Sequence, residues 1–149
     1  MKKKLVYIAF SVDILHEGHI NILKKAAQHG EVLVGLLTDI AIGLYKSLPH
    51  FNYEKRKLII ESVKYVSNVV PQDTLDYTKN LKKYKPHYVV HGDDWKNGFQ
   101  KSIRLKVIRT LKLWNGKLIE PKYTSDISSG KIKKTVFATG TTPEIRKSK

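Results

Sequence analysis

Short apolar runs alternate with longer stretches of helical periodicity along this chain. Residues 5–10 are apolar without interruption and predict a buried strand, whereas residues 19–28 carry apolar side chains every three to four positions and predict a helix. Gly30 follows this helix, as glycine commonly does at a helix end. The same patterns predict further strands at 31–38, 67–71, 87–91 and 117–120, and further helices at 39–44, 53–65, 74–84, 99–114 and 128–136.

The order of these elements predicts the fold class. Strands that alternate with helices form parallel sheets covered by helices on both faces, and residues 31–38 are apolar on both faces, as a central parallel strand is. We therefore expect an α/β, Rossmann-like, doubly wound sheet of five parallel strands. Ligands bind such sheets beyond the carboxyl ends of the strands, where the strand order reverses. We expect one domain over residues 1–138, followed by a polar tail or connector over 139–149.

Composition narrows the classes of function. The chain has 149 residues, no cysteine and a formal net charge of +15, with 28 lysine and arginine residues against 13 aspartate and glutamate residues. Disulfides and thiolate sites are excluded, and no apolar stretch reaches the roughly 18 residues of a membrane span. We expect a cytoplasmic protein without membrane contact. The charge favours anionic partners. A nucleic-acid-binding domain is therefore the alternative from another class, although no nucleic-acid-binding motif appears.

The strongest candidate chemistry lies at His16-Glu17-Gly18-His19, between the first predicted strand and the first predicted helix. Backbone N–H groups at a helix start attract phosphate, and Gly18 keeps side-chain bulk away from a ligand there. Residues three apart share a helix face, so both imidazoles can point at one oxygen-rich group and stabilise charge that develops on phosphorus. The competing interpretation is a metal-binding or helix-capping pair of histidines.

Four blocks carry a resemblance to a known family. They are residues 13–19 with the His-x-Gly-His motif, 53–57 (Tyr-Glu-Lys-Arg-Lys), 91–95 (His-Gly-Asp-Asp-Trp) and 123–129 (Tyr-Thr-Ser-Asp-Ile-Ser-Ser). In order and spacing they resemble the cytidylyltransferases of the nucleotidyltransferase superfamily. The domain fused to phosphoenolpyruvate mutase in phosphonate biosynthesis is the most similar, and glycerol-3-phosphate cytidylyltransferase is a relative. The resemblance covers roughly residues 4–135.

The resemblance implies a reaction and its catalytic residues. A phosphonate or phosphate oxygen of the acceptor attacks the α-phosphorus of CTP and pyrophosphate leaves, with Mg²⁺ bridging the triphosphate oxygens. His16 and His19 contact the α-phosphate, and Lys46 reaches the triphosphate or the acceptor. Tyr45 and Ser47 flank Lys46 where the glycerol-phosphate enzyme has lysines, which suggests a different acceptor. A solvated loop lysine is the competing interpretation of Lys46. No metal-binding residue is assigned.

The resemblance also implies binding residues. Arg56 matches an arginine that binds the acceptor's phosphate, the alternative being an exposed arginine in the first turn of a helix. Asp94 and Trp95 are expected on the acceptor side, although Trp95 suits core packing equally well. Hydroxyl groups and free N–H groups before the last predicted helix suit a phosphate cradle, but Tyr123 and Asp126 depart there from the relatives' arginine and glycine. The nucleotide-binding residues expected are Phe10, Ser11, Gly18, Gly92, Asp94, Thr124, Ser128 and Ser129.

The acceptor is the component of the reaction that the sequence specifies least. The preferred acceptor is a small phosphonate, 2-hydroxyethylphosphonate or 2-aminoethylphosphonate, and the alternative is glycerol 3-phosphate or phosphoethanolamine. The resemblance also allows a homodimer, and residues 140–146 resemble the connector that leads into a mutase domain in fused proteins. A degenerate or docking domain of a larger phosphonate enzyme is a third interpretation, and the intact His16 and His19 argue against it.

Overall fold

The computed structural model describes residues 3–122 and residue 132. The predicted helix over 128–136 therefore lies outside the described residues except at residue 132, which is helical. The predicted tail over 139–149 lies outside them as well. Among the site residues expected from the sequence, three have no described position: Thr124, Ser128 and Ser129.

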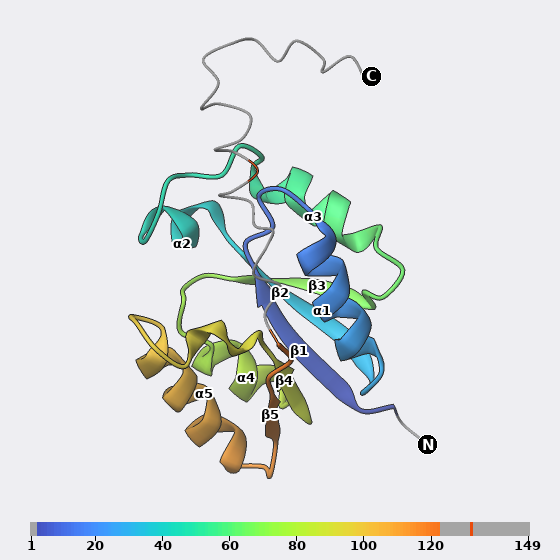
Figure 1. Cartoon of the computed structure of the whole chain (residues 1–149), viewed down its shortest axis with the longest axis vertical. Helices are drawn as coiled ribbons and strands as arrows, with labels where there is room; N and C mark the ends of the chain where they lie inside the picture. Colours follow the sequence, from blue (N-terminus) through green and yellow to red (C-terminus); the bar gives the residue numbers. More distant parts are fainter. Residues whose placement is uncertain (1–2, 123–131, 133–149) are drawn as a thin grey trace.

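Five parallel strands form a single sheet in the order β3-β2-β1-β4-β5 (Figure 1). The strands are β1 (Leu5–Phe10), β2 (Glu31–Leu37), β3 (Asn68–Gln72), β4 (Tyr88–Val90) and β5 (Lys117–Ile119). Strands β1 and β2 pair along the whole of β1, from Leu5 beside Glu31 to Phe10 beside Leu36. The predicted class and strand count are confirmed.

Helices cover both faces of the sheet, as Figure 1 shows. They are α1 (Glu17–Ala27), α2 (Asp39–Gly43), α3 (Tyr53–Glu61), α4 (Thr78–Tyr84) and α5 (Lys101–Lys112), and Asp93–Trp95 forms a 3-10 turn. On one face, Leu23 of α1 and Ile60 of α3 pack with Val34 and other strand residues. On the opposite face, Leu81 of α4 and Leu111 of α5 pack with strand residues that include Tyr7 and Leu33. Within the described part of the chain, no helix is long and apolar enough to cross a membrane.

The strand order reverses between β1 and β4. From β1 the chain winds outward through β2 to β3, and then α4 carries it back over the sheet to β4 on the other side of β1. The connections that leave β1 and β4 therefore diverge at their carboxyl ends, and this divergence opens a crevice suited to ligands. The His-x-Gly-His motif follows β1, and the residues around Asp94 follow β4, so the fold brings both blocks to this crevice.

Helix α5 spans Lys101–Lys112 rather than residues 99–114, and the starts of α1 and α4 differ from the prediction because side chains near them bond to the backbone. Helix α1 begins at Glu17 rather than residue 19, since His16 caps it. Helix α4 begins at Thr78 rather than residue 74. There, Thr74 Oγ1 accepts from the Asp76 N–H at 3.1 Å, and Asp76 Oδ1 accepts from the Thr78 N–H at 2.8 Å. These local bonds replace the first helical turn.

Helix α3 ends at Glu61, where the sequence pattern predicts residue 65. Within this helix, Leu58 and Ile59 are 68% and 37% exposed. Ile60 is fully buried instead, and so is Arg56 one turn before it. An apolar run that contains Leu58, Ile59 and Ile60 fits more than one helix rotation. The burial of Arg56 decides which rotation the helix takes.

Candidate active site

His16 and His19 hold the start of α1 through reciprocal hydrogen bonds. The Nδ1 atom of His16 accepts from the Gly18 N–H at 3.0 Å, and the Nδ1 atom of His19 accepts from the His16 N–H at 3.2 Å. The two rings lie with centroids 4.0 Å apart. An Nδ1 atom that accepts carries no proton, so each neutral imidazole has its proton on Nε2. The pair therefore caps the helix and still offers two Nε2–H donors.

Both histidines stay neutral at ordinary pH. Burial lowers the pKa of His19 to about 3, and nearby His16 and Lys46 act in the same direction. Burial also lowers the pKa of His16, against an opposing effect of Glu17. A neutral Nε2–H group can donate to an oxygen that gains negative charge without a prior change in protonation. The arrangement suits charge stabilisation better than proton removal.

The turn between β1 and α1 is tightly built. Val12 is 2% exposed and has a φ of 48°, a backbone conformation that β-branched residues rarely adopt. Such a conformation costs on the order of 1–3 kcal/mol, and the surrounding structure must hold it. Phe10 contacts the His19 ring edge-on, with centroids 5.2 Å apart. The turn thus presents the histidines from a rigid base.

A cavity of about 170 Å³ opens beside this turn, at the carboxyl edge of the sheet. We call it the carboxyl-edge cavity. Phe10, Ser11 and His19 approach it from β1 and α1, while other side chains approach it from the connections after β3 and β4. The latter include Tyr77, His91 and Trp95. Residues that follow three different strands therefore come together at one edge of the sheet.

Lys46 lies beside the turn that carries the motif. Its Nζ atom donates to Ser11 Oγ at 3.3 Å and lies 5.3 Å from the centre of the Tyr45 ring. Its effect on the pKa of His19 places its charge near that imidazole. Tyr45 also lines the carboxyl-edge cavity. The loop after α2 therefore brings one cation to the mouth of the site.

Arg56 does not face an acceptor in this structure, and this corrects the expected acceptor-binding role. Its side chain is fully buried. Three backbone carbonyls accept from its guanidinium: those of Phe51 at 3.0 Å, Ser11 at 2.7 Å and Leu37 at 2.8 Å. Asp39 Oδ1 accepts from it at 2.6 Å. Arg56 thus joins the ends of β1 and β2 to the loop before α3, which are backbone groups that sequence spacing alone does not bring together.

Trp95 is packed in the core, where it is 1% exposed, and it also lines the carboxyl-edge cavity. Its ring stacks on His91 with centroids 3.7 Å apart and planes 5° apart. Its Nε1–H donates to Glu120 Oε2 at 2.8 Å, and Arg104 binds both oxygens of that carboxylate. Trp95 is therefore a rigid wall of the cavity.

The residues near Trp95 also lie at this edge. Gly92 lies between β4 and the 3-10 turn, and its carbonyl lies 2.7 Å from His91 Nδ1. Asp94 Oδ1 lies 3.8 Å from the same nitrogen, on a side chain that is 43% exposed. A proton on Nδ1 suits both contacts and leaves Nε2 of His91 as an acceptor. Burial lowers the pKa of His91.

Sequence reasoning missed three side chains that line the cavity. His91 received no assigned role, although its place at the end of a predicted strand was a usable signal. Gln72 ends β3 and Tyr77 follows this strand, whose carboxyl end reaches the same edge. No motif marks either residue, and Tyr77 fell inside a predicted helix. Among the described residues, no group of three or more histidine, cysteine, aspartate or glutamate side chains is placed to hold a metal ion.

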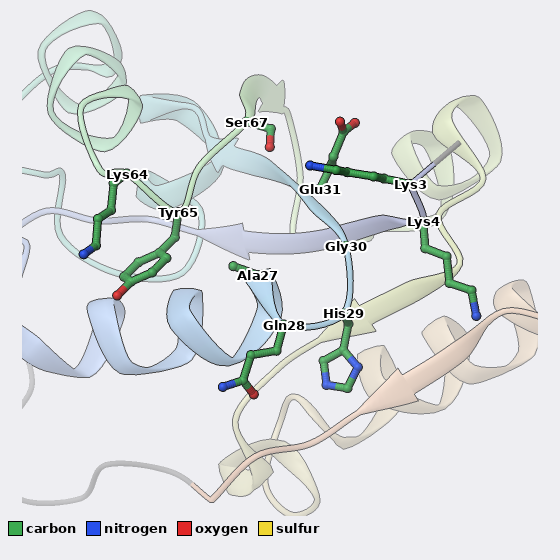
Figure 2. A pocket seen from close by; sticks show the side chains of 10 residues that line it. All are labelled: Lys3, Lys4, Ala27, Gln28, His29, Gly30, Glu31, Lys64, Tyr65 and Ser67. Carbon is green, nitrogen blue, oxygen red and sulfur yellow. The ribbon is translucent and has the colours of Figure 1, made fainter. Parts of the chain in front are cut away.

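A second, wider hollow of about 400 Å³ lies at the opposite, amino edge of the sheet (Figure 2). Lys3 and Lys4 precede β1 there, and His29 and Gly30 precede β2, while Lys64 comes from the connection after α3. It contains no residue expected from the motifs. The carboxyl-edge cavity therefore remains the candidate site.

Comparisons with known proteins identify the family of this chain. A family model described as cytidylyltransferase-like matches residues 11–135. Glycerol-3-phosphate cytidylyltransferase of Bacillus subtilis (strain 168) is 37% identical over 101 residues, which are 66% of this chain and 77% of that protein. Ethanolamine-phosphate cytidylyltransferase of Mus musculus is 37% identical over 84 residues, 55% of this chain and 21% of that longer protein.

The fold has solved counterparts. A crystal structure of the lipopolysaccharide core biosynthesis protein from Thermoplasma volcanium GSS1 matches 81% of this chain and 98% of that one, with a TM-score of 0.68 at 24% identity. The fold and the matched sequences together define a nucleotidyltransferase. The chain belongs to the cytidylyltransferase-like family, whose enzymes transfer CMP from CTP.

Proposed function

We propose that this enzyme transfers CMP from CTP to a small acceptor that carries a phosphate group, either phosphoethanolamine or glycerol 3-phosphate. Both acceptors appear in the names of relatives. The observation that carries the proposal is the carboxyl-edge cavity, which is lined by His19, the neighbour of His16, and, at about 170 Å³, is of a size for a small acceptor. The phosphonates 2-aminoethylphosphonate and 2-hydroxyethylphosphonate have similar shapes and belong in the same test.

The proposed reaction is a direct displacement at phosphorus. An oxygen of the acceptor's phosphate forms a bond to the α-phosphorus of CTP, and the bond from that phosphorus to the bridging oxygen of the β-phosphate breaks. Pyrophosphate leaves with the electron pair of that bond. A phosphate oxygen is already deprotonated at neutral pH, so no general base is needed. Neutral histidines that donate hydrogen bonds suit this chemistry.

Each nearby side chain has a proposed part in this reaction. The Nε2–H groups of His16 and His19 donate to the α-phosphate oxygens as their charge grows. Lys46, beside Ser11, offsets the charge of the phosphates. Phe10 and Ser11 form the adjoining wall, and Asp94 lies on the β4 side of the cavity mouth. Magnesium, carried by the triphosphate oxygens of CTP, would neutralise the leaving pyrophosphate.

Pyrophosphate release tests the proposal. The purified chain would be incubated with CTP and Mg²⁺ and each of the four acceptors in turn, with ATP as the rival nucleotide. Mass spectrometry would identify the CDP-linked product. His16→Asn is the matched control because asparagine also caps helices but lacks the imidazole donor. Release that depends on CTP and one acceptor, and is lost in His16→Asn, supports the proposal. The proposal is contradicted if none of the four acceptors leads to pyrophosphate release, or if release is unchanged in His16→Asn.

A further inference from the structure

The hydroxyl group of Tyr77 has no hydrogen-bond partner in the described part of the chain. The residue is 7% exposed and lines the carboxyl-edge cavity. Within residues 3–122, no hydrogen bond involves its hydroxyl. Among the fully buried side-chain nitrogen and oxygen atoms in that part of the chain, only the Tyr53 hydroxyl lacks a hydrogen-bond partner. The Tyr77 hydroxyl therefore retains some accessible surface, and the cavity is the space that Tyr77 lines.

The neighbouring tyrosine shows how this core satisfies a hydroxyl when no ligand is involved. Tyr7 contacts Tyr77 edge-on, with ring centroids 6.0 Å apart. Its hydroxyl donates to Gln72 Oε1 and accepts from Asn80 Nδ2. Asn80 also donates to the Pro71 carbonyl at 2.9 Å. A buried hydroxyl without such partners is unfavourable. The contrast between the two tyrosines therefore indicates that the Tyr77 hydroxyl forms a hydrogen bond with a ligand.

The surroundings of Tyr77 indicate the charge of that ligand. Its ring lies 5.8 Å from that of Trp95, which in turn stacks on His91. Aromatic faces of this kind attract cations. Asp94 belongs to the same 3-10 turn as Trp95, and its carboxylate Oδ1 lies 3.8 Å from Nδ1 of His91, which also lines the cavity. Lys46 and the paired histidines belong to the connections after β2 and β1, and so approach the cavity from another side.

We propose that Tyr77 is a specificity-determining residue that accepts a hydrogen bond from a terminal ammonium group of the acceptor. This inference rests on the proposed function and narrows it to the aminoethyl class, represented by phosphoethanolamine. The acceptor's phosphate faces the histidines and Lys46, and its ammonium group lies among Tyr77, Trp95 and Asp94. Burial, with Tyr7, Tyr45 and Asp94, raises the pKa of Tyr77, so its hydroxyl is neutral and able to accept.

A thermodynamic cycle tests this contact by removing one functional group from the protein and one from the acceptor. Tyr77→Phe removes the hydroxyl from the protein and keeps the ring, and ethyl phosphate lacks the amino group of phosphoethanolamine. For phosphoethanolamine, kcat/KM is expected to fall about tenfold in Tyr77→Phe, mainly through KM of the acceptor. For ethyl phosphate, kcat/KM is expected to be the same in both proteins, and KM for CTP should not change. Such coupling isolates one pairwise interaction.

Tyr7→Phe is the matched control, because it deletes a buried hydroxyl that bonds only within the protein. It should lower the resistance to urea without altering the ratio of kcat/KM between the two acceptors. An equal fall for both acceptors in Tyr77→Phe would overturn the inference and leave the proposed function intact. Transfer to glycerol 3-phosphate but not to phosphoethanolamine would overturn the ammonium assignment. Transfer to no acceptor by the unaltered chain would overturn the proposed function, and this inference with it.

Discussion

Asp13 and His50 join the motif turn to the loop that carries Lys46. Asp13 is 4% exposed, and its Oδ1 atom accepts from the His50 N–H at 2.7 Å. Its Oδ2 atom lies 3.3 Å from His50 Nδ1. The contact spans 37 residues of sequence and comes just before the paired histidines. Asp13 therefore positions a long loop against the candidate active site.

Replacement of Asp13 should loosen that loop. In Asp13→Ala the N–H of His50 loses its side-chain acceptor, at a cost of about 1 kcal/mol. We expect faster amide hydrogen exchange over residues 45–52 and a fall in kcat/KM of about tenfold, because Lys46 loses its fixed position. Asp13→Asn keeps an oxygen acceptor and should lie between the two proteins. Unchanged exchange in Asp13→Ala would show that other contacts hold the loop.

His16 should contribute separately to stability and to activity, because Nδ1 caps the helix while Nε2–H stays available. His16→Ala should lower the free energy of unfolding by about 1 kcal/mol, the usual effect of losing a helix cap. His16→Asn should keep most of that stability. Both variants should lose about 10²–10³ in kcat, since neither offers the donor. Urea unfolding and pyrophosphate release measure the two effects. Activity that survives in His16→Asn would limit His16 to a capping role.

Arg56 should matter for folding more than for acceptor binding. Arg56→Ala removes a buried cation and leaves three carbonyl oxygens and Asp39 without their donor. We expect a loss of about 3–5 kcal/mol in the free energy of unfolding. Lys55→Ala, at the exposed neighbouring position, should stay within about 0.5 kcal/mol of the unaltered chain. If Arg56→Ala left stability unchanged and raised only the acceptor's KM, the acceptor-binding prediction would be right after all.

The lowered pKa of His19 should make stability depend on pH. In the folded chain His19 stays neutral down to about pH 3, whereas in the unfolded chain it binds a proton near its ordinary value of 6.5. The unfolded state thus binds more protons between these values, so stability falls as the pH falls from about 6.5 towards 3. The slope from one such group is about 1.4 kcal/mol per pH unit.

His19→Gln isolates this contribution, because glutamine does not titrate. The difference in free energy of unfolding between the unaltered chain and His19→Gln should shift in favour of the variant as the pH falls below about 6.5. Urea unfolding at a series of pH values measures it, and subtraction removes the contribution of the carboxylates. A difference that is constant with pH would mean that the pKa of His19 is the same in the folded and unfolded chains.

The sequence by itself determined the parts of this protein that depend on local spacing. Apolar runs marked the five strands, because a buried parallel strand needs a continuous apolar segment. The order of strands and helices predicted the sheet, and the His-x-Gly-His spacing predicted that His16 and His19 share one helix face. Each inference uses residues within one element or its direct neighbour. Such relationships are visible along a chain without knowledge of its tertiary structure.

Only the tertiary structure decided which side chains meet across elements. The sequence allows Arg56 to be an exposed helix residue or a ligand of the acceptor. The rotation of α3 instead buries it among carbonyls at the ends of β1 and β2 and in the loop before α3. Tyr77 and His91 belong to connections after different strands, and they share a cavity because β1 lies between β2 and β4 in the sheet. Strand order and helix rotation follow from packing over the whole core. The sequence therefore predicted the edge where the chemistry lies, and the packing decided what lines it.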